Sequence, residues 1–229
     1  MPEGLWCHMI IAAAGAGVRM GLGVPKQFAE LGGKPVWMHV YETCRRCASM
    51  QSATLVVPEG YESECGKMLL QQGDDGWFCR VVTGGKSRAD SVRKALDVLP
   101  PEAEIVLVQD AARPFTKAVQ IADVAKAAMA HGAAVLAVPV KDTVKRIGAD
   151  GRIESTPARE SLYLAQTPQG FRRGLLVMAY EKAEQEGFVG TDDASFVEYF
   201  GERPVIVPGD YRNIKLTTAE DMTLATLWM

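Results

Sequence analysis

The sequence predicts an α/β fold in which a largely parallel sheet is covered by helices on both faces. Fully apolar runs, such as 105–108 and 133–138, are typical of strands buried on both faces. These runs alternate with segments of helical spacing, such as 88–99, whose apolar residues fall on one face. Strands that alternate with helices favour a parallel sheet. At 229 residues the chain is long enough for one large domain, or for one domain with an extension.

Local signals place the boundaries of several elements. Pro35 suits the first turn of a helix that continues through Cys44. Gly132 is placed to cap the helix 117–131, and Thr218 is a good cap for the last helix. Further strands are expected at 8–13, 53–57, 78–83, 163–166 and 205–207, and further helices at 61–72, 172–186 and 191–199.

A β-hairpin interrupts this alternation. Residues 144–147 and 152–155 predict its two strands, with a turn through Asp150 and Gly151. The strands have few apolar residues to bury, and a two-stranded ribbon is marginal alone. We therefore expect the hairpin to project from the domain and pack on something else, most simply a second copy of the protein. A mobile surface hairpin is the alternative.

Composition and charge exclude several classes of protein. Hydrophobic residues make up 48% of the chain and charged residues 23%, as in ordinary globular proteins. A net charge of −3 provides no general attraction to nucleic acid or anionic membranes, so neither is an expected partner. The amino terminus does not resemble a signal peptide, and no apolar run approaches the roughly 18 residues of a membrane span. Five scattered cysteines favour the reducing cytoplasm, and Cys44 and Cys47 are expected to pack or lie at the surface rather than form a metal or redox site.

The Gly-rich stretch after the first predicted strand predicts a phosphate-binding loop. Gly15 and Gly17 free the backbone so that N–H groups can turn inward, and the cations Arg19 and Lys26 follow. The stretch lacks the Gly-Lys-Ser/Thr ending of a Walker loop, and Met20 stands where a dinucleotide fingerprint needs glycine. An ordinary strand-to-helix turn is the alternative, but the two cations favour a triphosphate site.

The polar residues in the loops are mostly cations and hydrogen-bond donors. They are Arg19, Lys26, Arg88, Asp110, Arg113, Thr143, Thr167, Thr191 and Lys215. A site with cations but no protein nucleophile suits phosphoryl or nucleotidyl transfer, where positioning and charge stabilisation dominate. A phosphate acceptor needs no general base, because it is largely dianionic at neutral pH. Asp110 at a strand end then predicts a Mg²⁺ contact, direct or through water, and the alternatives are a helix cap or a partner of Arg113.

Seven short motifs, in order along nearly the whole chain, are highly specific when taken together. They are Ala13-Ala14-Gly15-x-Gly17-x-Arg19-Met20 with Pro25-Lys26-Gln27, Gly84-Gly85 with Arg88-Ala89-Asp90-Ser91-Val92, Asp110-Ala111-Ala112-Arg113-Pro114, Pro139-Val140-Lys141-Asp142-Thr143-Val144-Lys145, Ala165-Gln166-Thr167-Pro168-Gln169, Thr191-Asp192-Asp193-Ala194-Ser195 and Asn213-Ile214-Lys215. In this order they resemble the 2-C-methyl-D-erythritol 4-phosphate cytidylyltransferase family of non-mevalonate isoprenoid synthesis. Four positions depart from the family's usual residues: Ala12, Lys86, Gln109 and Ala158.

The resemblance implies a Rossmann-like sheet in a single nucleotidyltransferase domain over 1–229, and a homodimer in which a β-arm at about 141–165 crosses to the partner. It also implies CTP and Mg²⁺ as co-reactants, with the sugar phosphate attacking the α-phosphorus of CTP and expelling pyrophosphate. The site residues that it implies are catalytic Arg19, Lys26 and Lys215; CTP-binding Ala13, Ala14, Gly15, Gly17, Gly85 and Ser91; and substrate-binding Asp110, Arg113, Thr143, Arg159, Thr167 and Thr191, with Asp110 also at the metal. Arg159 would reach the substrate of the neighbouring subunit.

Three other functions remain open from the sequence. The nearest is a related cytidylyltransferase that acts on ribitol 5-phosphate, since it would share the CTP loops and differ in the acceptor pocket. The others are a sugar-nucleotide transferase that uses another base and a non-catalytic nucleotide-binding module.

Overall fold

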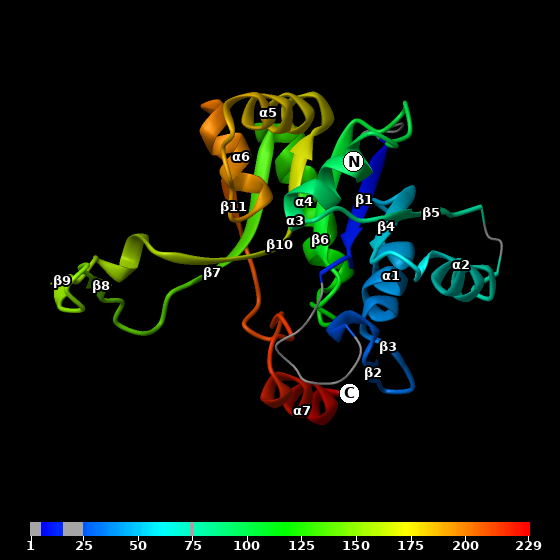
Figure 1. Cartoon of the computed structure of the whole chain (residues 1–229), viewed down its shortest axis with the longest axis horizontal. Helices are drawn as coiled ribbons and strands as arrows, with labels where there is room; N and C mark the ends of the chain where they lie inside the picture. The colour runs from blue at the N-terminus through cyan, green and yellow to red at the C-terminus, as the bar shows by residue number, and fades with distance from the viewer. Residues whose placement is uncertain (1–5, 16–24, 74–75) are drawn as a thin grey trace.

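A mixed seven-stranded sheet forms the centre of the molecule in the computed structural model, which describes residues 6–15, 25–73 and 76–229. The strands lie in the spatial order β11-β7-β10-β6-β1-β4-β5 (Figure 1). They are β1 (Cys7–Ala12), β4 (Ser52–Val57), β5 (Phe78–Thr83), β6 (Ile105–Asp110), β7 (Ala133–Pro139), β10 (Tyr163–Arg172) and β11 (Val205–Pro208). Neighbouring strands are parallel except at β10, which runs antiparallel to both β6 and β7. The expected Rossmann-like, mostly parallel α/β sheet is confirmed.

Helices cover both faces of the sheet, as the alternation of strands and helices predicts. One apolar layer holds Met9 and Ile11 of β1, and the opposite layer holds Ile10, because successive side chains of a strand point to opposite faces. The helices packed on the first layer are α1 (Val36–Arg46), α2 (Glu62–Leu70) and α4 (Ala118–His131), and those on the second are α3 (Arg88–Leu96), α5 (Arg173–Glu186) and α6 (Asp193–Phe200). Gly132 ends α4 with φ +89°, so its predicted capping position is confirmed.

Strand β10 differs from the prediction, which ended it at residue 166. The sequence from Gln166 to Gly170 contains amides, Pro168 and glycine, a composition typical of a turn. Tertiary packing nevertheless keeps this segment extended and buried between β6 and β7. Gly170 allows α4 to approach closely, since a Cβ atom there would lie 2.8 Å from a Val124 methyl carbon. Local sequence could not predict this strand, because its stability comes from its neighbours.

The predicted hairpin is present and projects from the body of the molecule. Strands β8 (Arg146–Ile147) and β9 (Ile153–Ser155) pair antiparallel, and a 3-10 turn, η3 (Arg159–Ser161), follows them. Figure 1 shows this arm extending well beyond the sheet, joined to it through β7 and β10. Nearly every residue of the segment 141–165 is exposed. The projection is confirmed, and packing on a second copy stays a prediction.

The carboxyl-terminal segment lies beyond the carboxyl ends of the central strands, at the bottom of Figure 1. Helix α7 (Ala219–Trp228) begins at a capping box made by Thr218 and Asp221. It packs near the short pair β2 (Glu30–Leu31) and β3 (Lys34–Pro35), and Leu216 joins Leu31 in a small apolar cluster there. No helix among the described residues is long and apolar enough to cross a membrane.

Candidate active site

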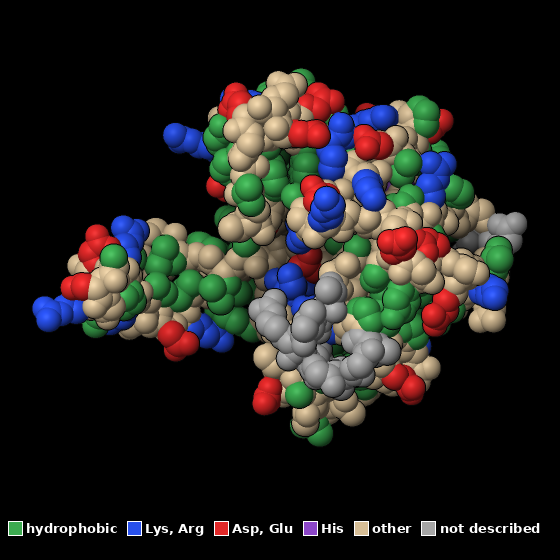
Figure 2. All heavy atoms as spheres, in the orientation of Figure 1, with side chains coloured by type: hydrophobic (Ala, Val, Ile, Leu, Met, Phe, Trp, Pro, Cys, Tyr) green, Lys and Arg blue, Asp and Glu red, His purple; other side chains and the backbone are tan. Residues whose placement is uncertain are grey.

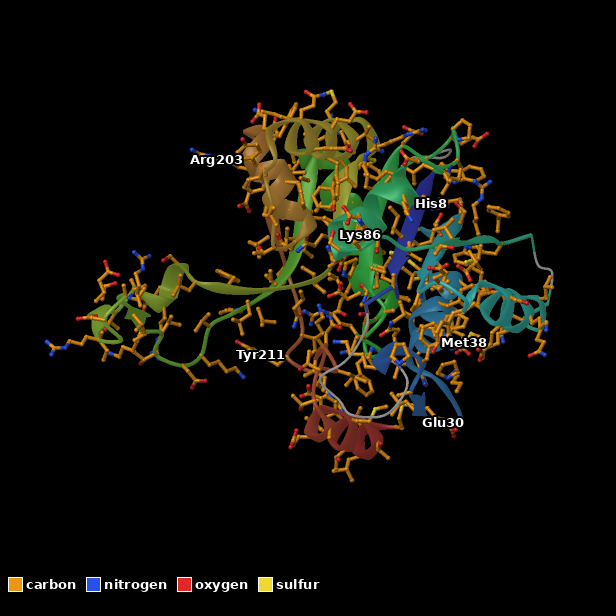
Figure 3. All side chains as sticks on the ribbon, in the orientation of Figure 1. His8, Glu30, Met38, Lys86, Arg203 and Tyr211 are labelled. Carbon is orange, nitrogen blue, oxygen red and sulfur yellow. The ribbon has the colours of Figure 1, made fainter. Side chains whose placement is uncertain are left out.

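A cavity of about 560 Å³ lies at the carboxyl ends of β1 and β6. The residues that line it are Ala12, Ala14, Gly15, Lys26, Gln27, Gly85, Lys86, Ser87, Arg88, Ser91, Asp110, Ala112, Lys215 and Thr217. In Figure 2 basic side chains surround an acidic one at the centre of this face, and Figure 3 shows Lys86 in front of the central strands. Ligands of open α/β sheets bind at this end of the strands. The cavity brings together loops that are far apart in sequence.

The described part of the Gly-rich loop is held in place by Gln27. The Gln27 amide donates to the main-chain oxygen of Ala13 and, at 2.7 Å, to that of Gly15. Lys26 opens the short 3-10 helix η2 (Lys26–Phe28) and lines the cavity. Of the predicted loop residues, Ala14 and Gly15 line the cavity and Ala13 is buried behind it. Predicted residues Gly17 and Arg19 lie outside the described residues.

Two adjacent glycines let the loop after β5 approach the end of β1. A Cβ atom on Gly84 would collide with the Ala14 side chain and lie 2.9 Å from Ser91 Oγ, and one on Gly85 would collide with Asp90. The Gly85 N–H donates to Ser91 Oγ at 3.0 Å, and Ser91 Oγ donates to the Ser87 carbonyl at 2.8 Å. Glycine is therefore required here for space rather than for a special backbone angle. Gly85 and Ser91 line the cavity as predicted.

The charged centre of the cavity is the carboxylate of Asp110, the last residue of β6. Its Oδ1 accepts from Arg88 Nε at 3.1 Å, and its Oδ2 accepts from Lys215 Nζ at 2.6 Å. Burial would raise the pKa of Asp110, but the two cations outweigh burial and hold that pKa well below its usual range. The Arg113 guanidinium donates instead to the Asn213 carbonyl at 2.7 Å. Among the described residues, the direct charged partners of the Asp110 carboxylate are therefore Arg88 and Lys215, and neither a helix cap nor Arg113 occupies its oxygens.

The loop that carries Lys215 is fixed by a buried asparagine. Asn213 is fully buried, and its amide donates to the Thr167 carbonyl at 3.0 Å. Thr167 Oγ1 in turn accepts from the Asp110 N–H at 3.0 Å. The Tyr211 hydroxyl, labelled in Figure 3, donates to the Pro139 carbonyl at 2.6 Å, where the arm leaves the sheet. Lys215 is thus placed by contacts with β6, β10 and the base of the arm.

Of the six predicted substrate residues, Asp110 lines the cavity and the other five do not. Arg113 and Thr167 contact Asn213, and the remaining three are exposed. Thr143 and Arg159 are exposed on the arm, and Thr191 is exposed in the loop before α6. Arg159 donates to the Lys141 carbonyl at 3.2 Å, within the same arm. Their predicted role toward a substrate, with Arg159 acting in the neighbouring subunit, stays a prediction.

The sequence places Arg88 among the loop cations and Asp193 in a motif, but it predicts no role for either residue in the site. Arg88 is the first residue of α3, directly after the Gly84-Gly85 loop, and Asp193 is the first residue of α6. The position of Arg88 beside a glycine loop was a usable signal. The partner of Asp193 could not be predicted, because its 2.7 Å bond to Arg88 joins two distant segments of the chain.

The donor set fits Mg²⁺ only together with a substrate phosphate chain. Among the described residues no three His, Cys, Asp or Glu side chains group around a common point. Mg²⁺ commonly takes one or two carboxylates and completes its shell with phosphates and water. Asp110 could supply one oxygen if Lys215 turned to the phosphates. The residues present therefore fit an ion that arrives with the nucleotide.

A cavity with clustered cations, one carboxylate and Gly-rich walls at the strand ends of such a sheet defines an enzyme of the nucleotidyl-transfer class. Residues 7–229 match the family model described as "IspD: 2-C-methyl-D-erythritol 4-phosphate cytidylyltransferase". A protein of that name from Pelotomaculum thermopropionicum is 43% identical over 94% of this chain and 91% of its own length, and one from Bacillus pumilus is 44% identical over 96% of each. The crystal structure of 4-diphosphocytidyl-2C-methyl-D-erythritol synthase from Anaerococcus prevotii is similar with a TM-score of 0.88 and 33% identity, covering 99% of this chain and 96% of that one. The chain belongs to the 2-C-methyl-D-erythritol 4-phosphate cytidylyltransferase family.

Proposed function

We propose that this chain transfers the cytidylyl group of CTP to 2-C-methyl-D-erythritol 4-phosphate, giving 4-diphosphocytidyl-2-C-methyl-D-erythritol and pyrophosphate in the non-mevalonate isoprenoid pathway. The observation that carries the proposal is the convergence of Lys26, Arg88, Asp110 and Lys215 on one cavity, in a chain of this family. The whole domain, residues 1–229, acts as one nucleotidyltransferase unit.

The reaction is an in-line displacement at the α-phosphorus of CTP. A phosphate oxygen of the acceptor forms the new P–O bond, and the bond to the bridging oxygen of pyrophosphate breaks. The acceptor phosphate is largely dianionic at neutral pH, so no side chain has to remove a proton. What the site must supply is alignment and positive charge around the transition state.

The cations around the cavity would supply this positive charge. Lys26 and Lys215 are assigned to the triphosphate, and Arg19, as the resemblance implies, acts with them. Lys215 stands 2.6 Å from Asp110, so it is oriented before the nucleotide arrives. Mg²⁺, when bound with the nucleotide and with Asp110 as its protein ligand, would screen the negative charge of the phosphates.

The remaining residues divide between the two substrates. Ala13, Ala14, Gly15, Gly17, Gly85 and Ser91 are assigned to CTP, and Asp110, Arg113, Thr143, Arg159, Thr167 and Thr191 to the acceptor. Thr143 and Arg159 lie on the arm, so a homodimer in which the arm reaches the neighbouring subunit would bring them to a substrate. The free cysteines of the chain suit the cytoplasm.

The test is pyrophosphate release in the presence of CTP, Mg²⁺ and each acceptor separately. We expect release with 2-C-methyl-D-erythritol 4-phosphate and not with ribitol 5-phosphate. Release only with ribitol 5-phosphate would overturn the choice of acceptor. Competition with GTP, UTP and ATP tests the choice of base, and a loss of CTP preference would contradict it.

A further inference from the structure

Arg88 bridges two carboxylates that belong to different loops. Its Nε donates to Asp110 at 3.1 Å, and its Nη2 donates to Asp193 at 2.7 Å. Asp193 is fully buried, and its second oxygen accepts from the Tyr180 hydroxyl at 2.7 Å. At the other end of the series, Lys215 occupies the second oxygen of Asp110 at 2.6 Å. Five side chains thus form a continuous series from α5 to the loop of Lys215.

We propose that Arg88, anchored by Asp193, is a positioning residue that holds the Asp110 carboxylate in place when Lys215 leaves it for the triphosphate. This inference rests on the proposed function, because it concerns the step in which a nucleotide draws Lys215 away. Neither Arg88 nor Asp193 is required to touch the reacting atoms.

The charges of the series explain why such a residue is needed. Two carboxylates face two cations, so the series is neutral while Lys215 stays on Asp110. Asp110 is only 7% exposed, and a buried carboxylate without a counter-charge is strongly unfavourable. With Arg88 present, Asp110 keeps one cation after Lys215 has moved. Without Arg88, Lys215 would be the one direct cation of Asp110 among the described residues, and it would be held back from the nucleotide.

The anchor suits an arginine and not a lysine. A planar guanidinium can donate to two carboxylates at once, whereas an ammonium on a flexible stem acts as a point charge. Asp193 lies in the first turn of α6, where a helix favours negative charge, and Asp192 caps that helix. Tyr180 is itself held by stacking on Phe196, with ring centroids 4.3 Å apart. Burial would lower the pKa of Arg88, but the two carboxylates outweigh it and raise that pKa, so Arg88 stays charged.

Steady-state pyrophosphate release by Arg88→Lys and Asp193→Asn tests the inference. For Arg88→Lys we expect kcat to fall by about 10- to 100-fold while the KM for CTP changes less than about threefold, because misplacement of catalytic groups affects the transition state more than nucleotide binding. Asp193→Asn should show the same split with a smaller loss. The double variant should lose little more than Arg88→Lys alone, since both changes act through one contact.

Arg93→Lys is the matched control, on the same helix and with the same change. Arg93 pairs with Asp97 and Glu184, both largely exposed, and we expect its variant to keep the kcat and KM of the unaltered enzyme. If Arg88→Lys fails to fold, Asp193→Asn decides by itself.

Three outcomes would overturn the inference: normal kcat in both single variants, losses that add in the double variant, or a rise in KM for CTP with kcat unchanged. An unaltered enzyme that releases no pyrophosphate would instead overturn the proposed function, and this inference with it. The two failures are therefore distinguishable.

Discussion

The cavity at the strand ends buries polar side chains, whereas the projecting arm exposes apolar ones. At the cavity, charged and polar side chains such as Asp110, Asp193 and Asn213 are buried and paired within the chain. On the arm, apolar side chains are exposed: Ile147 is 53% and Ile153 61% accessible. Among the described residues, the body of the molecule supplies partners for its own site, whereas the arm has little to pack against.

This difference separates two requirements of the proposed enzyme. The cavity can be assembled by a single chain, because Asp110 and Asp193 already find their counter-charges there in Arg88 and Lys215. The arm exposes apolar area that a second surface would have to cover, and a two-stranded ribbon is marginal alone. Changes in the cavity should therefore affect chemistry, and changes in the arm should affect assembly.

The largest effect is expected from removing a cation of the cavity. Lys215→Ala should lower kcat by about 1,000-fold, because positive charge at the transition state is the main contribution of the site. Lys26→Ala should have a comparable effect. Circular dichroism should show an intact fold in both, and near-normal turnover of either variant would contradict its catalytic assignment.

The next effect concerns a buried polar group of the body, His8, whose ring nitrogens lie 2.7 Å from Ser52 Oγ and 2.9 Å from Thr54 Oγ1. Burial, aided by Arg80, lowers the pKa of His8 from 6.5 to about 4. Between pH 4 and 6.5, His8 is therefore protonated in the unfolded chain and neutral in the folded chain. Stability is fully present above pH 6.5 and should fall by about 3 kcal/mol as the pH approaches 4.

Urea unfolding at several pH values between 7 and 4 measures this loss. His8→Gln should remove the contribution of His8 to the slope of unfolding free energy against pH. The exposed His131 provides the control, and His131→Asn should keep the slope. An unchanged slope in His8→Gln would assign the pH dependence to other groups.

A smaller effect is expected in the arm. Ile153→Asp puts a charge in place of an apolar side chain that is 61% exposed, and should convert the proposed dimer to a monomer with about a tenfold loss of activity. Light scattering and pyrophosphate release measure the two effects. Val189→Asp is the control, because Val189 is 87% exposed but lies outside the arm. A fully active monomer at micromolar concentration would refute the role of Arg159 in the neighbouring subunit.

The last comparison substitutes one glycine in each region. Gly84→Ala would bring a Cβ atom against Ala14 and Ser91, and should raise the KM for CTP by about tenfold by separating the two loops. Gly151 in the arm has φ +76° and open space around it, so Gly151→Ala should cost about 1 kcal/mol of local strain and leave the KM unchanged. Equal KM values for the two variants would remove the distinction between the regions.

Much of the fold could be predicted because its signals are local. The continuous apolar run of β1 and the cap at Gly132 depend on neighbours along the chain. The hairpin was predicted for the same reason, from its turn and its few apolar residues. The full length of β10 was not, since residues 166–171 are held extended by β6, β7 and α4 rather than by their own propensity.

The site divides in the same way. The Gly-rich loop, the glycine pair and the cations that follow them are predicted from local sequence, because close backbone approach and phosphate binding require those residue types. Which charges meet depends on the tertiary fold, which pairs Asp110 with Lys215 and Arg88 with Asp193. Such pairs depend on burial and on the order of the strands, neither of which is a property of local sequence.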